Sequence, residues 1–254
     1  MVRVCKSNQH LKVGPSGSVL GGGGPAEGPT EGPTDKKNSW SNTRQSIMDY
    51  WSQYYIDRAR ERLEPSSFAR WCTDEGWVTS SDHVVDAGCG DGRDAIFFAG
   101  LGASVVAVDA ADSAVQRCVA SGLCSKCASM GSLPEPDELL SPGAAAGRLV
   151  VYSRFSLHAI DAKEAKAFLA WCRLHADVLL IETRSVNDPR YGRGDDAGDG
   201  AFVDTHYRRF TRLGDLTTEL QALGFVVEHA SEDWKAARTA YDAAVVNRVV
   251  VRRP

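Results

Sequence analysis

Residues 83–109, HVVDAGCGDGRDAIFFAGLGASVVAVD, decide the fold of this chain. The opening residues are short, apolar and β-branched, which is typical of a buried strand that runs into Asp86. Three glycines follow at alternate positions, and a turn of this kind lets the backbone adopt φ > 0 and approach a ligand closely. An apolar helical pattern and a second short strand come next, and that strand ends at Asp109. The stretch therefore predicts a strand, a turn, a helix and a second strand.

Two acids flank the glycine turn. Asp86 lies two residues before the first glycine. Asp109 lies about twenty residues after the glycines, the spacing at which a carboxylate can accept hydrogen bonds from ribose hydroxyls. A nicotinamide-binding turn would read G-x-G-x-x-G, but Arg93 stands where its third glycine belongs. The acid before the turn also suits a ligand with a positive amino group better than a pyrophosphate, so the motif disfavours a nicotinamide cofactor.

These residues give the sequence a resemblance to the class I, Rossmann-like S-adenosylmethionine-dependent methyltransferases. The match consists of residues 86–92, which read D-x-G-x-G-x-G, and of Asp109. The resemblance covers about residues 45–252. It implies an α/β fold: a mostly parallel seven-stranded sheet, helices on both faces and an antiparallel C-terminal strand pair. The open alternative is a strand–helix–strand unit whose glycines serve only close packing.

The resemblance implies S-adenosyl-L-methionine as cofactor and a set of residues that contact it. Asp86 is expected near the ammonium group and Asp109 at the ribose hydroxyls. The full expected set is Asp86, Gly88, Cys89, Gly90, Gly92, Asp94, Asp109, Ala110 and Tyr152. Many members of the family hold the adenine amino group with an acid after the third strand. Residues 127–130 are the best candidate for that strand, and only Ser129 or Ser132 is available there.

Length, charge and cysteine content limit the class of function. The chain has 254 residues and a formal net charge of −4, so we expect one α/β domain with extensions and no basic nucleic-acid surface. The sequence contains no run of about 18 apolar residues, so it predicts no membrane span. The first residues lack the apolar core of a secretory signal. The seven cysteines are scattered and odd in number, which favours a reducing compartment and a cytoplasmic location.

Three cysteines lie close together in the sequence. Cys124 and Cys127 form a C-x-x-C pair, and Cys118 is nearby. No second C-x-x-C and no neighbouring histidine completes a tetrahedral ligand set, so we expect no metal.

The N-terminal part divides into two regions. Residues 1–40 are rich in Gly, Pro, Ser and Thr, and we expect them to be disordered because they bury too little apolar surface to offset their ordering entropy. Residues 41–254 are the expected methyltransferase domain, beginning with helices at about 41–75. The first helix carries an aromatic stripe, formed by Ile47, Trp51, Tyr54 and Tyr55. The stripe either packs on the domain or covers the cofactor cleft as a lid, as N-terminal helices often do in the family.

Arginines follow the later strands. Arg154 ends the predicted fourth strand, Arg184 ends the fifth, and Arg208 closes the connection at 185–210, which we expect to be a long loop over the substrate. Ligands of open parallel sheets lie beyond the carboxyl ends of the strands, and planar guanidiniums bind carboxylate or phosphate groups. We therefore predict a small anionic acceptor, bound by Tyr55, Arg154, Arg184 and Arg208.

The need for a catalytic base depends on the acceptor. An acceptor oxygen that is already ionised requires none, whereas a hydroxyl or an amine must lose a proton. His158 is the first candidate for that base and His206 the second, because imidazole titrates near neutral pH; Arg154 completes the catalytic set. O-methylation is the favoured prediction. N-methylation of a neutral small molecule with a histidine base, and a scaffold without catalytic activity, are the alternatives, and the sequence does not define the oligomeric state.

Overall fold

The computed structural model describes residues 37–57, 64–140, 147–237 and 243–254. The chain divides into two units, Met1–Gln45 and Ser46–Pro254. Helix α1 (Lys37–Asp57) begins in the first unit and continues into the second. It includes the last four residues of the segment 1–40 that the sequence predicts to be disordered, and the rest of that segment lies outside the described residues.

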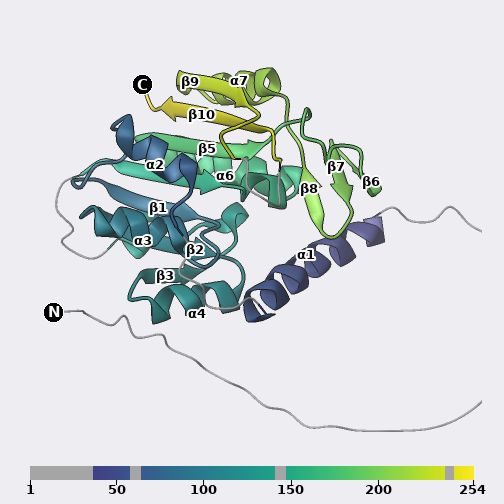
Figure 1. Ribbon diagram of the computed structural model, residues 1–254, viewed down its shortest axis with the longest axis horizontal. Coiled ribbons are helices and arrows are strands. Elements are labelled where there is room, and N and C mark those ends of the chain that lie inside the picture. Colours follow the sequence, from purple (N-terminus) through teal and green to yellow (C-terminus); the bar gives the residue numbers. More distant parts are fainter. Residues whose placement is uncertain (1–36, 58–63, 141–146, 238–242) are drawn as a thin grey trace, which may run out of the picture. The chain divides into compact units, whose positions relative to one another are not determined.

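A seven-stranded sheet forms the centre of the second unit, with the order β3-β2-β1-β4-β5-β10-β9 (Figure 1). Its strands are β1 (His83–Ala87), β2 (Ser104–Asp109), β3 (Cys124–Cys127), β4 (Leu149–Arg154), β5 (Val178–Arg184), β9 (Val226–Asp233) and β10 (Val246–Arg252). Strands β1 to β5 pair in parallel, and β10 pairs antiparallel with both β5 and β9. The predicted mostly parallel sheet with an antiparallel C-terminal pair is confirmed.

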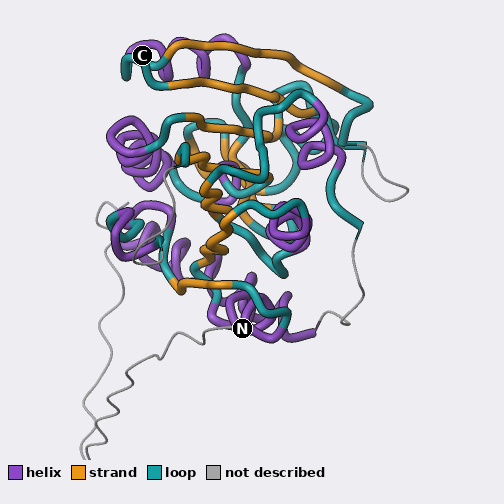
Figure 2. The backbone as a smooth tube through the Cα atoms, turned by 90° about the vertical axis from the view of Figure 1, so that its left-hand side faces the viewer, coloured by secondary structure: helices purple, strands orange, loops and turns teal. Residues whose placement is uncertain are grey.

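Helices cover both faces of this sheet (Figure 2). On one face lie α2 (Ser67–Asp74), α3 (Arg93–Gly100) and α4 (Asp112–Ala120), which pack on one set of alternate strand residues. The other face is covered mainly by α6 (Ala162–His175) and α7 (Leu213–Ala222), with the short α5 (Pro136–Leu139), η1 (Met130–Ser132) and η2 (Leu157–Ala159). Successive strand residues point to opposite faces, so one sheet serves two apolar cores. No helix within the described ranges is both long and apolar enough to span a bilayer.

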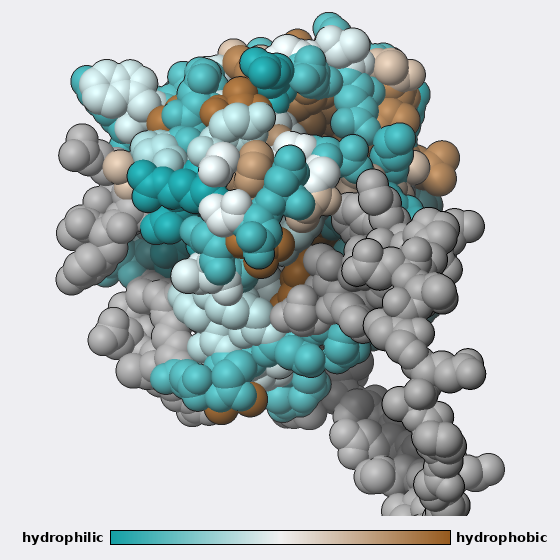
Figure 3. All heavy atoms as spheres, turned by 90° about the vertical axis from the view of Figure 1, so that its right-hand side faces the viewer, coloured by the Kyte–Doolittle hydropathy of each residue, from teal (hydrophilic) through white to brown (hydrophobic). Residues whose placement is uncertain are grey.

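The predicted loop at 185–210 contains a second sheet. Three short antiparallel strands, β6 (Asp195–Gly198), β7 (Ala201–Val203) and β8 (Tyr207–Arg209), pair in sequence order. Asp199 and Gly200 turn the first hairpin with φ of 52° and 72°, which is the Asp-Gly signal of such turns. The strands escaped prediction because they are short and carry charges. Figure 3 shows the side of the molecule that carries this sheet, where most of the described surface is hydrophilic.

The third strand also differs from its prediction. It spans Cys124–Cys127 and not residues 127–130. Strand β3 lies at the edge of the sheet and pairs only with β2, and all four of its residues are at least partly exposed. An edge strand without a buried face has no apolar pattern to reveal it.

Candidate functional site

The glycine turn between β1 and α3 is held by the carboxylate that ends β2. The backbone N–H of Gly90 donates to Asp109 Oδ2 and that of Ala111 donates to Asp109 Oδ1, both at 2.9 Å. The backbone N–H of Gly88 donates to the carbonyl oxygen of Val108 at 2.7 Å. Burial raises the pKa of Asp109, while the backbone donors of Ala111 and Gly90 oppose that rise. Asp109 thus faces the turn, and its partial exposure leaves it accessible at the sheet edge.

The three glycines of the turn have φ of +76° at Gly88, +57° at Gly90 and +78° at Gly92. A Cβ on Gly88 would overlap Ser156, and a Cβ on Gly92 would lie 2.8 Å from Cys118 Sγ. At these two positions the absence of a Cβ leaves room for neighbouring side chains of the protein, which is what the alternative of glycines that serve close packing predicts. At Gly90 the group that fills this space is the hydroxyl of Tyr55 from α1.

Asp86 is the exceptional residue of the site. It is the penultimate residue of β1 and is 3% exposed, and no group in the described part of the chain donates a hydrogen bond to its carboxylate. Its pKa is raised well above 3.8, first by burial and then by the neighbouring charges of Asp94 and Asp109. An ionised carboxylate buried without a donor costs free energy. A positively charged ligand group at this position would remove that cost.

Asp94, on the first turn of α3, differs from Asp86 because its carboxylate has several hydrogen-bond donors within the chain. This carboxylate accepts hydrogen bonds from the backbone N–H of Ser66 (2.7 Å), the Ser66 hydroxyl (2.7 Å) and the Tyr152 hydroxyl (2.8 Å). Tyr152 is 1% exposed and its ring lies against Phe68 and Phe98. Asp94 and Tyr152, both predicted to contact the cofactor, thus belong to an internal network that joins α2, α3 and β4.

Among the remaining expected cofactor residues, Cys89 has its side chain packed within the protein and Ala110 has no polar side chain, so their polar groups at the turn are those of the backbone. Cys89 Sγ lies 3.7 Å from Cys118 Sγ, against the apolar core under α3 and α4. The carbonyl oxygen of Ala110 is 3.6 Å from Cys127 Sγ. On the expected adenine side, the Ser129 hydroxyl donates to Glu164 at 2.6 Å. That bond engages the hydroxyl within the chain and removes the main reason to assign it to adenine.

The aromatic residues of α1 lie against the glycine turn and the β7–β8 turn. The Tyr50 ring stacks on His206 with centroids 4.5 Å apart, and the Trp51 ring meets the same imidazole at 5.0 Å. The Ser113 hydroxyl of α4 donates to the carbonyl oxygen of Ser52 at 2.9 Å. Burial, followed by the charge of Asp109, raises the pKa of Tyr55 well above 10. Tyr55 was predicted among the acceptor residues, and the structure places its hydroxyl against Gly90 of the glycine turn.

Arg154 joins a charge network that spans three strands. Its Nε donates to Glu182 Oε1 at 2.9 Å, and Arg248 Nε donates to Glu182 Oε2 at 2.8 Å. Glu182 is 0% exposed. The terminal nitrogens of Arg154 donate to no group in the described ranges, and its side chain is 15% exposed. Sequence reasoning missed Arg248, although a single arginine inside the run VVNRVVV signals a buried partner.

The other two predicted arginines are also paired within the chain. Arg184, 5% exposed, donates to Asp188 Oδ2 at 2.6 Å. Arg208, 7% exposed, forms an ion pair with Asp204, and its Nη2 lies 3.2 Å from Nδ1 of His206. These contacts fix both guanidiniums, so neither presents the free arginine that the sequence suggested.

Both candidate bases are held neutral. Burial, then the charges of Arg184, His206, Arg208 and Arg154, lowers the pKa of His158 well below 6.5. Burial and the charge of Arg208 lower the pKa of His206 to about 4. His158 is 4% exposed, and its Nδ1 is buried and has no hydrogen-bond partner in the described ranges. The structure therefore brings the two histidines and three arginines together, but in an arrangement that resists protonation of imidazole.

Solved structures share this architecture over most of the chain. A 1,6-didemethyltoxoflavin-N1-methyltransferase from Burkholderia thailandensis, solved with 1,6-didemethyltoxoflavin and S-adenosylhomocysteine, aligns with a TM-score of 0.59 and 14% identity over 89% of this chain and 93% of its own. The CcbJ methyltransferase from Streptomyces caelestis aligns with a TM-score of 0.59 and 13% identity over 82% of this chain and 97% of its own. The [4+2]-cyclase SpnF aligns with a TM-score of 0.59 and 13% identity over 84% of this chain and 96% of its own.

No protein-family model matches the sequence, and no curated protein does. At these identities the likeness concerns architecture. The chain has the fold of the class I S-adenosylmethionine-dependent methyltransferases.

Proposed function

We propose that this protein is a methyltransferase that uses S-adenosyl-L-methionine to methylate a small anionic acceptor, with O-methylation favoured. The observation that carries the proposal is Asp86, a buried carboxylate without a donor beside a glycine turn. The cofactor carries an ammonium group, which matches the charge that this position lacks. The shared fold supports the same choice, since one similar structure contains S-adenosylhomocysteine.

The residues at the ends of β1 and β2 fit this cofactor. Asp86 would hold the ammonium group. Asp109 keeps lone pairs for ribose hydroxyls beside the backbone of Ala110. Backbone at Gly88, Cys89, Gly90 and Gly92 would line the methionine portion, and Tyr55 would cover the turn from α1. When bound, the cofactor supplies a methyl group on a sulfonium, which is open to direct displacement.

The charge environment favours an acceptor that is already ionised. Two neutral histidines among arginines are weak bases, because each resists taking up a proton. The same positive surroundings favour an oxyanion over a neutral amine. Arg154 has terminal nitrogens free to meet such an anion. His158, His206, Arg184 and Arg208 would then shape the acceptor site and exclude water, and N-methylation with a histidine base is the less favoured alternative.

Calorimetric titration tests the cofactor assignment. S-adenosylmethionine and S-adenosylhomocysteine should both bind, Asp86→Asn and Asp109→Ala should weaken both, and NAD should not compete. An acceptor screen with a labelled methyl donor should then give turnover with carboxylic acids or phenols and not with neutral amines. Absence of heat with either ligand in folded protein would overturn the cofactor assignment.

A function without methyl transfer is the second candidate. The [4+2]-cyclase among the similar structures shows that this fold accommodates other reactions. Cofactor binding without turnover across the acceptor screen would favour that class or a scaffold. Since the scattered cysteines favour a reducing compartment, we place the protein in the cytoplasm.

A further inference from the structure

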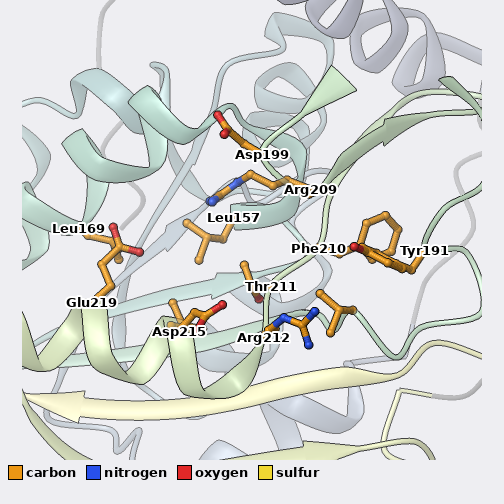
Figure 4. A pocket seen from close by; sticks show the side chains of 13 residues that line it. Leu157, Leu169, Tyr191, Asp199, Arg209, Phe210, Thr211, Arg212, Asp215 and Glu219 are labelled. Carbon is orange, nitrogen blue, oxygen red and sulfur yellow. The ribbon is translucent and has the colours of Figure 1, made fainter. Parts of the chain in front are cut away.

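A cavity of about 280 Å³ lies between the three-stranded sheet, η2, α6 and α7. Its walls include the apolar side chains of Leu157, Leu169 and Leu216, and its charged lining includes Arg209, Asp215 and Glu219. Figure 4 shows the Arg209 side chain extending from β8 over Leu157 toward the middle of these residues. Pockets that hold drug-sized ligands measure about 300–1,000 Å³, so this cavity fits a smaller molecule.

The cavity is separate from the proposed acceptor site. Successive residues of a strand point to opposite sides, and β8 contains both Arg208 and Arg209. Arg208 turns toward Asp204 and His206, on the side that faces α1. Arg209 turns the other way and lines the cavity. Strand β8 therefore separates two ligand positions.

Two basic residues, Arg209 and Arg212, line the cavity, and Arg209 is the one with a buried nitrogen that has no hydrogen-bond partner in the described part of the chain. Its Nε is buried and makes no hydrogen bond, and nothing in the described ranges accepts from its other nitrogens or forms an ion pair with it. Arg154, Arg184 and Arg208 are all paired with carboxylates. A buried donor without an acceptor is costly, and a carboxylate matches the guanidinium fork with two parallel hydrogen bonds.

The acidic residues of the cavity define the other end of the ligand. Asp215 and Glu219 lie one turn apart on α7, and Asp199 lines the same space from the β6–β7 turn. These carboxylates repel a phosphate dianion and attract a positive group. The leucines between them provide an apolar wall.

We propose that this cavity binds a free α-amino acid with an apolar side chain. Its carboxylate pairs with Arg209, its ammonium group lies toward Asp215 and Glu219, and its side chain packs on Leu157, Leu169 and Leu216. The site is a second one, independent of methyl transfer.

Calorimetry without any methyl donor tests this site. L-leucine, L-valine, L-methionine and L-phenylalanine are titrated alongside 4-methylpentanoate, isopentylamine and inorganic phosphate. At least one amino acid should bind, and 4-methylpentanoate and isopentylamine, which carry the side chain of leucine, should bind about tenfold more weakly than L-leucine or worse, because each lacks one charged contact. Arg209→Gln should weaken the amino acid by about tenfold or more, and Arg209→Lys should weaken it less.

Matched variants distinguish this site from a general effect of charge and from the cofactor site. Arg193→Gln removes the same charge from an exposed position in the same connection and should leave binding unchanged. Asp86→Asn should also leave it unchanged, which excludes binding of the amino acid in place of the cofactor's methionine portion. Should Arg209→Gln fail to fold, Glu219→Gln should weaken binding of the amino acid and not of 4-methylpentanoate.

Three results would overturn the proposal. These are no binding of any amino acid up to about 10 mM, equal binding by wild type and a folded Arg209→Gln variant, or phosphate or the simple carboxylate binding as tightly as the amino acid. Because no methyl donor is present, each result leaves the proposed methyl transfer unaffected.

Discussion

Buried carboxylates lie in two regions near the carboxyl ends of the parallel strands, and they differ in whether the chain supplies hydrogen-bond donors to them. At the ends of β1 and β2, Asp86 is buried with no donor in the described ranges. Where the carboxyl ends of β4 and β5 meet the start of β10, Glu182 is also buried but accepts hydrogen bonds from Arg154 and Arg248. A charge that is satisfied within the chain stabilises the fold. A charge that is left without a partner is available to a ligand, and it is the better indicator of a binding site.

Glu182→Gln should give the largest loss of stability. The change leaves Arg154 and Arg248 beside a neutral group in a buried position, and breaking one side of a buried ion network costs about 3–5 kcal/mol. Urea unfolding monitored by circular dichroism measures it. A loss below about 1 kcal/mol would mean that the network is not structural.

Gly88→Ala should be next. The left-handed φ of +76° and the overlap with Ser156 both oppose a Cβ, for a combined loss of about 2–4 kcal/mol. Gly122→Ala is the matched control, because its φ is +83° but its Cβ would meet nothing within 4 Å; it should lose only about 1 kcal/mol. Equal losses in the two variants would contradict the close packing seen at Gly88.

Acid should weaken the contact between α1 and His206. The pKa of His206 falls from 6.5 to about 4 on folding, so the unfolded chain takes up the proton first. Its contribution to stability is present above pH 6.5 and is lost as the pH falls toward 4. Since the ring is partly exposed, we expect only about 1 kcal/mol. His206→Phe keeps the stacking on Tyr50 and should remove this part of the pH dependence in urea titrations.

The sequence predicted the sheet and the glycine turn because both depend on local signals. Buried β-branched runs mark β1, β4 and β5, and the turn requires glycines at fixed positions. The edge strand β3 and the strands at 195–209 lack such a pattern. The acceptor side was harder for another reason. Nothing local distinguishes Arg208, which pairs with Asp204, from its neighbour Arg209, which lines a cavity without a partner in the described ranges.

Asp94 and Asp86 show the same limit on the cofactor side. Both are buried acids within the motif region, and the sequence assigned both to the cofactor. They differ in their hydrogen-bond partners. Ser66 and Tyr152, which are distant in the chain, donate hydrogen bonds to Asp94 and not to Asp86. Pairing of charges is a tertiary property, so residue type and spacing identify candidates without separating an acid that is paired within the chain from one that is not.

Asp86→Asn, studied by urea unfolding and by calorimetry with S-adenosylhomocysteine, tests the central claim most directly. The raised pKa means that Asp86 favours folding less as the pH rises from 3.8 through its folded-state pKa. At pH 7 the variant should therefore be as stable as wild type or more stable, by up to about 1–3 kcal/mol, and the difference should vanish near pH 4. The same variant should bind S-adenosylhomocysteine about 10- to 100-fold more weakly. A variant that is less stable than wild type but binds the ligand unchanged would show that Asp86 is a structural residue, and would contradict the account.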